Sequence, residues 1–236
     1  MYYKRVIIET KKIKTILLFS LIILQCSLVF SPADVFAAES KTDNEISFVW
    51  AFAAIKNASG RPESVNIDRD ITLKKGDQIK MLVQLTSHCF VYVIHLGSKG
   101  EMSLLYPEGA GQHQLKNKVF IPQGDYWFTL DENKGKETVY LLASKTRLIS
   151  LEALFERYKT LDQGSKNNMK DQILSQIRRI KKQHKKPLYG KAERPVLIGG
   201  AFRGLEKEAS ENSITRHSIQ ITAKEFYSRT FIIHHE

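Results

Sequence analysis

The fold of this chain is decided by the stretch from Leu73 to Arg147, which reads LKKGDQIKMLVQLTSHCFVYVIHLGSKGEMSLLYPEGAGQHQLKNKVFIPQGDYWFTLDENKGKETVYLLASKTR. In this stretch, short runs of alternating apolar and polar residues are separated by Gly, Pro, Asn and Asp. Several short strands joined by tight turns are typical of an antiparallel sandwich or barrel-like sheet. We therefore predict a mainly β fold with an antiparallel β-sandwich-like core.

The alternation predicts strands at residues 78–85, 89–96, 101–106, 119–121, 126–130 and 138–143. The strand at 89–96 is apolar on both faces, which is typical of a central strand covered on two sides. A further strand is predicted at 46–55, where three alanines leave a short helix as the alternative, and residues 57–62 are predicted to form a loop. Strands at 218–223 and 226–235 close the chain, and the last is expected to pair back into the central sheet.

Between these strands the period changes to that of a helix. Apolar residues recur at helical spacing in Leu151, Leu154, Phe155, Tyr158 and Leu161. Ser150 is the expected N-cap. A break at 163–165 precedes a second helix, which we expect to start near Ser165 and to end before Pro187. The prediction is therefore a sandwich-like core with a two-helix insertion, α+β overall.

The first residues resemble a targeting segment. Lysines at 11, 12 and 14 precede an apolar run at 16–30, small residues follow at Val35 and Ala37, and cleavage is expected after Ala37 or Ala38. This order is typical of a secretory signal peptide. An uncleaved membrane anchor is the alternative, although the run contains Gln25 and is shorter than the roughly 20 apolar residues that a spanning helix needs. We therefore expect a protein that is exported, periplasmic or extracellular, with no transmembrane span once the signal is removed.

These patterns predict four segments. Residues 1–37 are the signal peptide, and residues 38–149 plus 214–236 form the β-sandwich-like domain. Residues 150–186 are the helical insertion with a basic end, and residues 187–213 are an irregular connection.

The composition limits the classes of function. Hydrophobic residues make up 42% of the chain, which is enough for a packed core and excludes a largely disordered protein. The net charge of +11 favours weak attraction to anionic surfaces. Cys89 is the one cysteine left if the segment containing Cys26 is removed, so no intramolecular disulfide is expected.

No catalytic, cofactor-binding or metal-binding residues are predicted, and no cofactor. Cys89 begins an apolar strand, where a free cysteine behaves as a small hydrophobic residue. Its neighbour His88 would point to the opposite face of a strand. His234 and His235 lack an accompanying set of spaced ligands. A secreted hydrolase that uses Cys89 with a distant histidine remains the enzymatic alternative.

A basic segment ends the second predicted helix and offers contacts for an anionic surface. Its basic residues are Arg178, Arg179, Lys181, Lys182, Lys185 and Lys186. The segment lacks interleaved aromatic residues for stacking on bases, so nucleic acid is not an expected partner. The alternative is an ordinary solvated helix end.

Several motifs occur in an order that resembles a known family. They are Lys75-Gly76-Asp77, the apolar run 90–107, Val119-Phe120-Ile121-Pro122, the run 135–144 and a closing strand that ends in histidine. Together they resemble the bacterial domain-of-unknown-function family 4384 (DUF4384), over residues 71–148 plus the C-terminal strand. The resemblance implies a β-rich module of the kind found in envelope proteins or beside kinase-like and caspase-like domains, with no established catalytic residues.

We therefore expect an exported non-enzymatic binding or interaction module of the bacterial cell envelope. Its partner is expected to be another envelope protein or an anionic envelope polymer. The loops at 97–100 and 108–118 are the expected contact surface. Binding to an anionic surface through Arg178–Lys186 is a further alternative.

Overall fold

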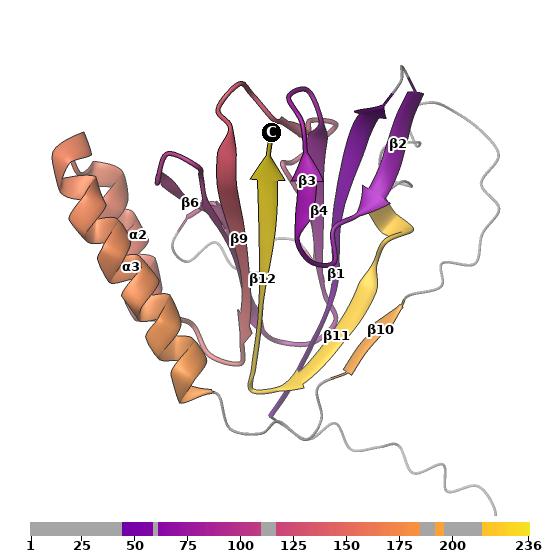
Figure 1. Cartoon of the computed structure of the whole chain (residues 1–236). Helices are drawn as coiled ribbons and strands as arrows, with labels where there is room; N and C mark the ends of the chain where they lie inside the picture. Colours follow the sequence, from indigo (N-terminus) through magenta and orange to yellow (C-terminus); the bar gives the residue numbers. More distant parts are fainter. Residues whose placement is uncertain (1–43, 59–60, 110–116, 185–191, 196–213) are drawn as a thin grey trace, which may run out of the picture. The chain divides into compact units, whose positions relative to one another are not determined.

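The computed structural model describes residues 44–58, 61–109, 117–184, 192–195 and 214–236. It contains two mostly antiparallel sheets and two helices, which confirms the prediction of a mainly β sandwich with a two-helix insertion (Figure 1). The predicted signal peptide at residues 1–37 lies outside the described residues. No helix in the part of the chain that the structure describes is long and apolar enough to span a membrane.

The first sheet is built around one long strand, β1 (Glu45–Ala58). All pairings of this sheet are antiparallel. Its strand order is β10 (Ala192–Pro195), β11 (Ile219–Lys224), β1, β4 (Gln78–Leu85) and β7 (Lys118–Ile121). Two further strands lie off this path, with β2 (Arg61–Asn66) paired to β1 and β8 (Phe128–Thr129) paired to β4.

The second sheet places the C-terminal strand between two distant segments. Its order is β3 (Ile71–Leu73), β12 (Phe226–His235), β9 (Gly135–Ser144), β5 (Phe90–Leu96) and β6 (Met102–Tyr106). β12 pairs with β9 from Phe226 opposite Ser144 to His235 opposite Gly135. This pairing confirms the expectation that the last strand returns to the central sheet. β3 joins the other edge of β12 in parallel.

A core of aromatic side chains fills the space between the two sheets. The Trp50 ring stacks on Phe231 with centroids 5.9 Å apart, and Phe52 meets Phe231 edge to face at 5.3 Å. Alternation along β1 directs residues 46, 48, 50, 52 and 54 into this core. The alanines do not convert the segment into a helix, because the inward positions from 46 to 52 are large side chains that the opposite sheet buries.

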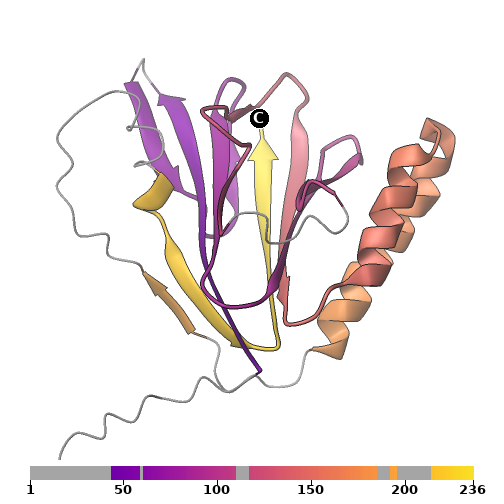
Figure 2. The ribbon, with the colours of Figure 1, turned by 180° about the vertical axis from the view of Figure 1, so that it is seen from behind.

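The helices α2 (Ile149–Thr160) and α3 (Gln163–Gln183) cover the other face of the second sheet (Figures 1 and 2). Tyr92 and Ile94 of β5 pack into a second apolar cluster with helix residues such as Phe155 and Ile173. Val91 and Val93 of the same strand face the core between the sheets. This double burial explains why the segment is apolar on both faces, as predicted.

A buried polar network fixes α2 to the sheet. The Tyr92 hydroxyl donates to Glu152 Oε1 at 2.7 Å and accepts from the backbone N–H of Leu148 at 2.8 Å. Arg147 makes an ion pair with Glu152, whose side chain is only 3% exposed. Burial is the largest cause that raises the pKa of Tyr92, so its hydroxyl stays protonated and available as a donor.

The starts of both helices differ from the sequence prediction. Ser150 is not the N-cap of α2, because Leu148 occupies that position without a side-chain cap. Tyr92 replaces the local cap by accepting from the N–H of Leu148. The segment 163–165 is not a break but the first turn of α3, since Asp162 caps it by accepting from the N–H of Ser165 at 3.0 Å.

Four further predictions for the strands and their connections need correction. The strand predicted at 126–130 is reduced to Phe128–Thr129, and Tyr126 is 78% exposed. The predicted loop at 57–62 is the tip of a hairpin, with residues 57–58 in β1 and 61–62 in β2. β3 was not predicted, and β10 lies within the segment predicted to be irregular.

We predict that Tyr92→Phe lowers the free energy of unfolding by about 1–3 kcal/mol, because the N–H of Leu148 and a buried Glu152 oxygen each lose a partner. Urea unfolding followed by circular dichroism measures this change. Tyr140→Phe is the matched control, since Tyr140 is half-buried against the same helices. The control should stay within about 0.5 kcal/mol of the wild type. Equal effects of the two substitutions would contradict the anchoring role.

Candidate functional site

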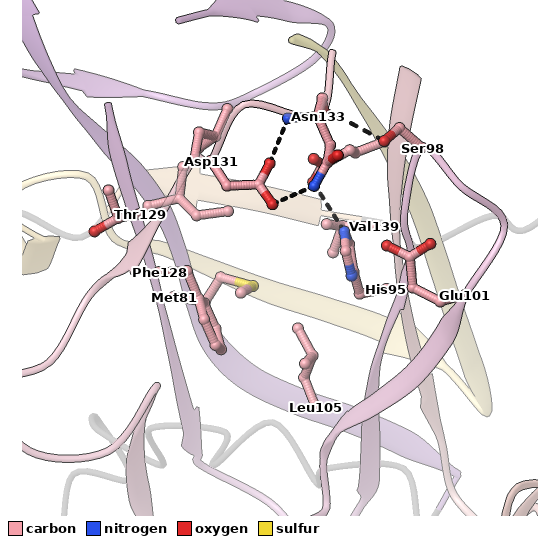
Figure 3. Close-up of a pocket in the computed structure, with 13 residues that line it drawn as sticks. Met81, His95, Ser98, Glu101, Leu105, Phe128, Thr129, Asp131, Asn133 and Val139 are labelled. Atoms are coloured by element: carbon pink, nitrogen blue, oxygen red, sulfur yellow. Dashed lines mark hydrogen bonds and ion pairs between the residues drawn. The ribbon is translucent and has the colours of Figure 1, made fainter. Parts of the chain in front are cut away.

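A cavity of about 220 Å³ lies at the end of the sandwich where β5 ends and β9 begins. Strands of both sheets and the turns that join them line it (Figure 3). Its apolar part consists of Ile79, Met81, Leu105, Phe128, Leu130 and Val139. Its polar part consists of His95, Ser98, Glu101, Thr129, Asp131, Asn133 and Glu137.

Glu137 is the centre of the polar part. His95 Nε2 lies 2.9 Å from Glu137 Oε2, within hydrogen-bond distance, and His235 Nδ1 lies 3.9 Å from Glu137 Oε1. The three residues come from β5, β9 and β12, and β9 lies between the other two strands. Each has the same parity along its strand as neighbours that face the core, namely Val93, Val139 and Ile233. The alternation that fills the core therefore also directs these three polar side chains inward.

His235 is buried without a hydrogen-bond partner. The residue is 3% exposed, and neither ring nitrogen has a partner among the described residues. A buried polar group left unpaired costs about 1–3 kcal/mol, so native structures rarely tolerate one without a reason. Its Nδ1 faces a carboxylate that lines the cavity, which connects this side chain to the site.

Two turns form the rim of the cavity. In the turn after β8, Asn133 donates its backbone N–H to Asp131 Oδ1 at 2.7 Å and its side-chain amide to Oδ2 (Figure 3). The bond from the Asn133 backbone is the main cause that holds the pKa of Asp131 below its ordinary value, so this side chain is a carboxylate at neutral pH. Ser98, in the turn after β5, donates to the backbone oxygen of Asn133 at 3.4 Å and connects the two turns.

Glu101 adds a third carboxyl group to the lining. A Cβ on Gly97 would lie 1.8 Å from Glu101 Oε1, so the glutamate side chain folds closely over the glycine backbone. The backbones of these two residues are also hydrogen-bonded, at 2.9 Å. The cavity thus combines an apolar floor with three acidic side chains, in a chain whose net charge is +11.

The described residues contain no group of three or more His, Cys, Asp or Glu side chains that could hold a metal ion. His234 is exposed and His235 is buried, in keeping with adjacent strand positions that point apart. No hydrogen bond within the described ranges links the Ser98 or Thr129 hydroxyl to His95.

Cys89 lies in the core and not in the cavity. It is fully buried, and its Sγ lies 3.8 Å from the backbone oxygen of Ser47. Burial raises the pKa of the thiol to about 11. The ring of the adjacent His88 packs edge to face on Phe90, with centroids 5.4 Å apart. The structure therefore does not direct the His88 ring to the Cys89 thiol.

The basic residues at the end of α3 separate into two groups. Arg178, Arg179 and Lys182 are exposed. Lys181 is half-buried and donates to Thr230 Oγ1 at 3.0 Å, and burial lowers its pKa. Lys185 and Lys186 lie outside the described residues.

Comparison with known proteins identifies one family. Residues 72–147 match the model of the family described as Domain of unknown function (DUF4384), which confirms the resemblance over that stretch. No curated protein and no solved structure matches the chain. All residues that line the cavity lie between 79 and 139, within the matched stretch, whereas α2, α3 and His235 lie outside it.

Sequence reasoning did not identify Glu137 or Asp131 as site residues. One signal was present, because Glu137 is a charged residue at an inward position of a strand otherwise occupied by Val139, Leu141 and Ala143. Its proximity to His235 could not be inferred, since the spacing of residues along one strand does not say which distant strand pairs with it.

We predict that Cys89 reacts slowly with a thiol reagent in the folded chain. The rise in pKa from 9.0 to about 11 alone reduces the reactive thiolate roughly 100-fold, and burial reduces access further. Ellman's reagent at pH 8 measures the rate, in a chain with Cys26→Ser so that one thiol is counted. Addition of Ser103→Cys, at an exposed position of β6, gives the reactive control. A native rate for Cys89 equal to its rate in urea would contradict the buried position.

Proposed function

We propose that this chain is an exported, non-enzymatic binding module of the bacterial cell envelope, and that it holds its ligand in the cavity between β4, β5 and β9. The observation that carries this proposal is the cavity itself, with its apolar floor and the inward-pointing Glu137 between two histidines. Small-molecule and side-chain sites are typically concave, mostly apolar and provided with a few polar groups that fix orientation.

Several features favour binding over catalysis. A histidine and a carboxylate form an acid–base pair, but covalent catalysis also needs a nucleophile within hydrogen-bond distance of the base. In the described structure His95 lies within hydrogen-bond distance of Glu137, and the Ser98 hydroxyl donates to the backbone oxygen of Asn133. A hydrolase based on Cys89 gains no support from a thiol that is fully buried with a raised pKa.

Export is supported by the sequence of residues 1–37. A basic start, an apolar run and small residues near Ala37 form the order that export machinery processes. The DUF4384 match is compatible with this location, because the resemblance implies modules found in envelope proteins.

The partner is proposed to be another envelope protein or an anionic envelope polymer. An anionic polymer would suit the three exposed basic residues Arg178, Arg179 and Lys182. They do not line the cavity, and their neighbour Lys181 contacts Thr230 in the middle of β12, whereas His235 at the end of β12 lies beside the cavity. If adsorption of the chain to phosphatidylglycerol vesicles did not weaken as salt is added, contact of these basic residues with an anionic polymer would be contradicted.

Export makes a prediction about the mature chain. Expression of the full chain in a bacterium should yield an envelope-fraction protein whose first residue is Ala38 or Glu39, because cleavage is expected after Ala37 or Ala38. N-terminal sequencing and intact mass measure the cut. Leu18→Arg interrupts the apolar run and should leave the uncut chain in the cytoplasm. An unprocessed wild-type chain in the cytoplasm would contradict export, and an unprocessed chain in the membrane would favour the anchor.

The cavity makes a prediction about partner capture. Thr129→Trp places a large side chain at the exposed mouth of the cavity and should abolish retention of the ligand from solubilised envelope. Thr72→Trp is the matched control, since Thr72 is exposed on β3 and does not line the cavity. Mass spectrometry of retained proteins and glycans compares the two variants with the wild type. Equal retention by both variants would place binding elsewhere on the chain.

A further inference from the structure

Glu137 has one carboxylate oxygen that accepts no hydrogen bond from the described residues. Oε2 lies 2.9 Å from His95 Nε2, but Oε1 is 3.9 Å from the nearest imidazole nitrogen, His235 Nδ1. A separation of 3.9 Å is too long for a hydrogen bond. The side chain of Glu137 is only 17% exposed, so bulk water solvates it poorly. A largely buried carboxylate with one oxygen that accepts no hydrogen bond is stabilised by a positively charged hydrogen-bond donor.

The unpaired ring of His235 is a second observation that, within the described structure, the polar groups around Glu137 are incompletely hydrogen-bonded. His235 approaches Glu137 from β12, on the opposite side from His95 on β5, and neither of its ring nitrogens has a hydrogen-bond partner among the described residues. The pair of His235 and Glu137 is thus held in place by the sheet without completing its own hydrogen bonds. His235 is fully buried and is not among the residues that line the cavity, so a ligand completes this pair only through Glu137, which does line it.

The rim strengthens the preference for a cation. Asp131 is a carboxylate whose oxygens are oriented by Asn133, and Glu101 has no ion pair among the described residues. Lys99, at the tip of the neighbouring turn, is close enough to help lower the pKa of Asp131. Glu137 and Glu101 line the cavity and have no ion pair with Lys or Arg among the described residues, so they are the carboxyl groups that a cationic ligand meets.

The floor and the volume define the rest of the ligand. Met81, Leu105 and Val139 form an apolar surface that suits an alkyl stem, and Phe128 offers an aromatic face that is 36% exposed. A volume of about 220 Å³ lies below the roughly 300–1,000 Å³ that is typical of sites for drug-sized molecules. The cavity therefore suits a group no larger than one long side chain.

We infer that the cavity binds an alkylammonium group, the chemistry shared by a lysine side chain of a partner protein and a free aliphatic amine. The ammonium group donates to Glu137 Oε1 and is surrounded by the carboxylates of the rim, while the alkyl stem lies on the apolar floor. This inference rests on the proposed function, in that it takes the cavity to be the ligand site and adds the chemical class of the ligand.

The test is a calorimetric titration of the purified chain with cadaverine and, separately, with Nα-acetyl-lysine N-methylamide. Hexanoate and pentanol are the controls, because they keep the alkyl stem and replace the ammonium group by a carboxylate or a hydroxyl. We expect both amines, or the lysine derivative alone, to bind at least about tenfold more tightly than either control. Binding of the lysine derivative alone indicates a protein partner, and binding of cadaverine as tightly indicates a free amine.

Substitutions assign the binding to the carboxylates. Glu137→Gln keeps the shape and an acceptor for His95 and should weaken amine binding about tenfold or more. Glu101→Gln, at the exposed rim, should weaken it without risk to the core. Glu63→Gln on the exposed surface of β2 is the matched control and should leave binding unchanged. Changes in the imidazole resonances of His95 and His235 on adding amine would report contact at Glu137 directly.

The outcomes separate this inference from the proposed function. Amines that bind no better than hexanoate, or that bind equally to both the Glu137→Gln and Glu101→Gln variants and the wild type, overturn the alkylammonium assignment. If Thr129→Trp still abolishes capture from the envelope in that case, the cavity remains the binding site for a ligand of another class. If Thr129→Trp also has no effect, the proposed function itself is wrong.

Discussion

The pairing of β12 with β9 is the interaction on which the rest of the structure depends. It joins residues 226–235 to residues 135–144 along their full length, across the whole helical insertion. The same strand supplies Phe231, which contacts both Trp50 and Phe52 in the core, and it holds β3 on its other edge. The register also sets His235 opposite Gly135 and so beside Glu137. Core and candidate site are therefore products of one long-range pairing.

The inner face of the second sheet changes character along its length. Toward the start of β12, inward positions are occupied by Tyr227, Ala143 and Val91, and the sheet packs tightly on its partner. Toward the other end the same parity carries His95, Glu137 and His235. Polar side chains at inward positions resist close packing of the two sheets unless each finds a partner, because burial removes their water. The cavity lies where the apolar alternation gives way to these polar residues.

Sequence periodicity predicted the strands with strong apolar alternation but failed where another kind of interaction decides the structure. β2 is mostly polar and forms through backbone pairing to β1, and Val65 is its one apolar side chain packed against the core, which is too little to produce an alternating pattern. The start of α2 depends on Tyr92, which is 56 residues away from Leu148. The candidate site depends on which strands are neighbours, and Glu137 and His235 are brought together only by the β9–β12 register. Local pattern therefore predicts which side chains face inward, and long-range pairing decides which of them meet.

A basic protein can hold an acidic site because charges act over limited distances. The exposed Arg178 lies near Tyr140, which pairs with Thr230 halfway along β12, and the cavity lies at the far end of that strand, five residues or roughly 15 Å further on. Screening at physiological salt has a length of about 8 Å, so this arginine contributes little to the potential at Glu137. Within the cavity, low exposure reduces screening and the nearest carboxylates dominate. The net charge of +11 then governs how the whole chain approaches anionic surfaces, while the lining of the cavity governs which ligand it can retain.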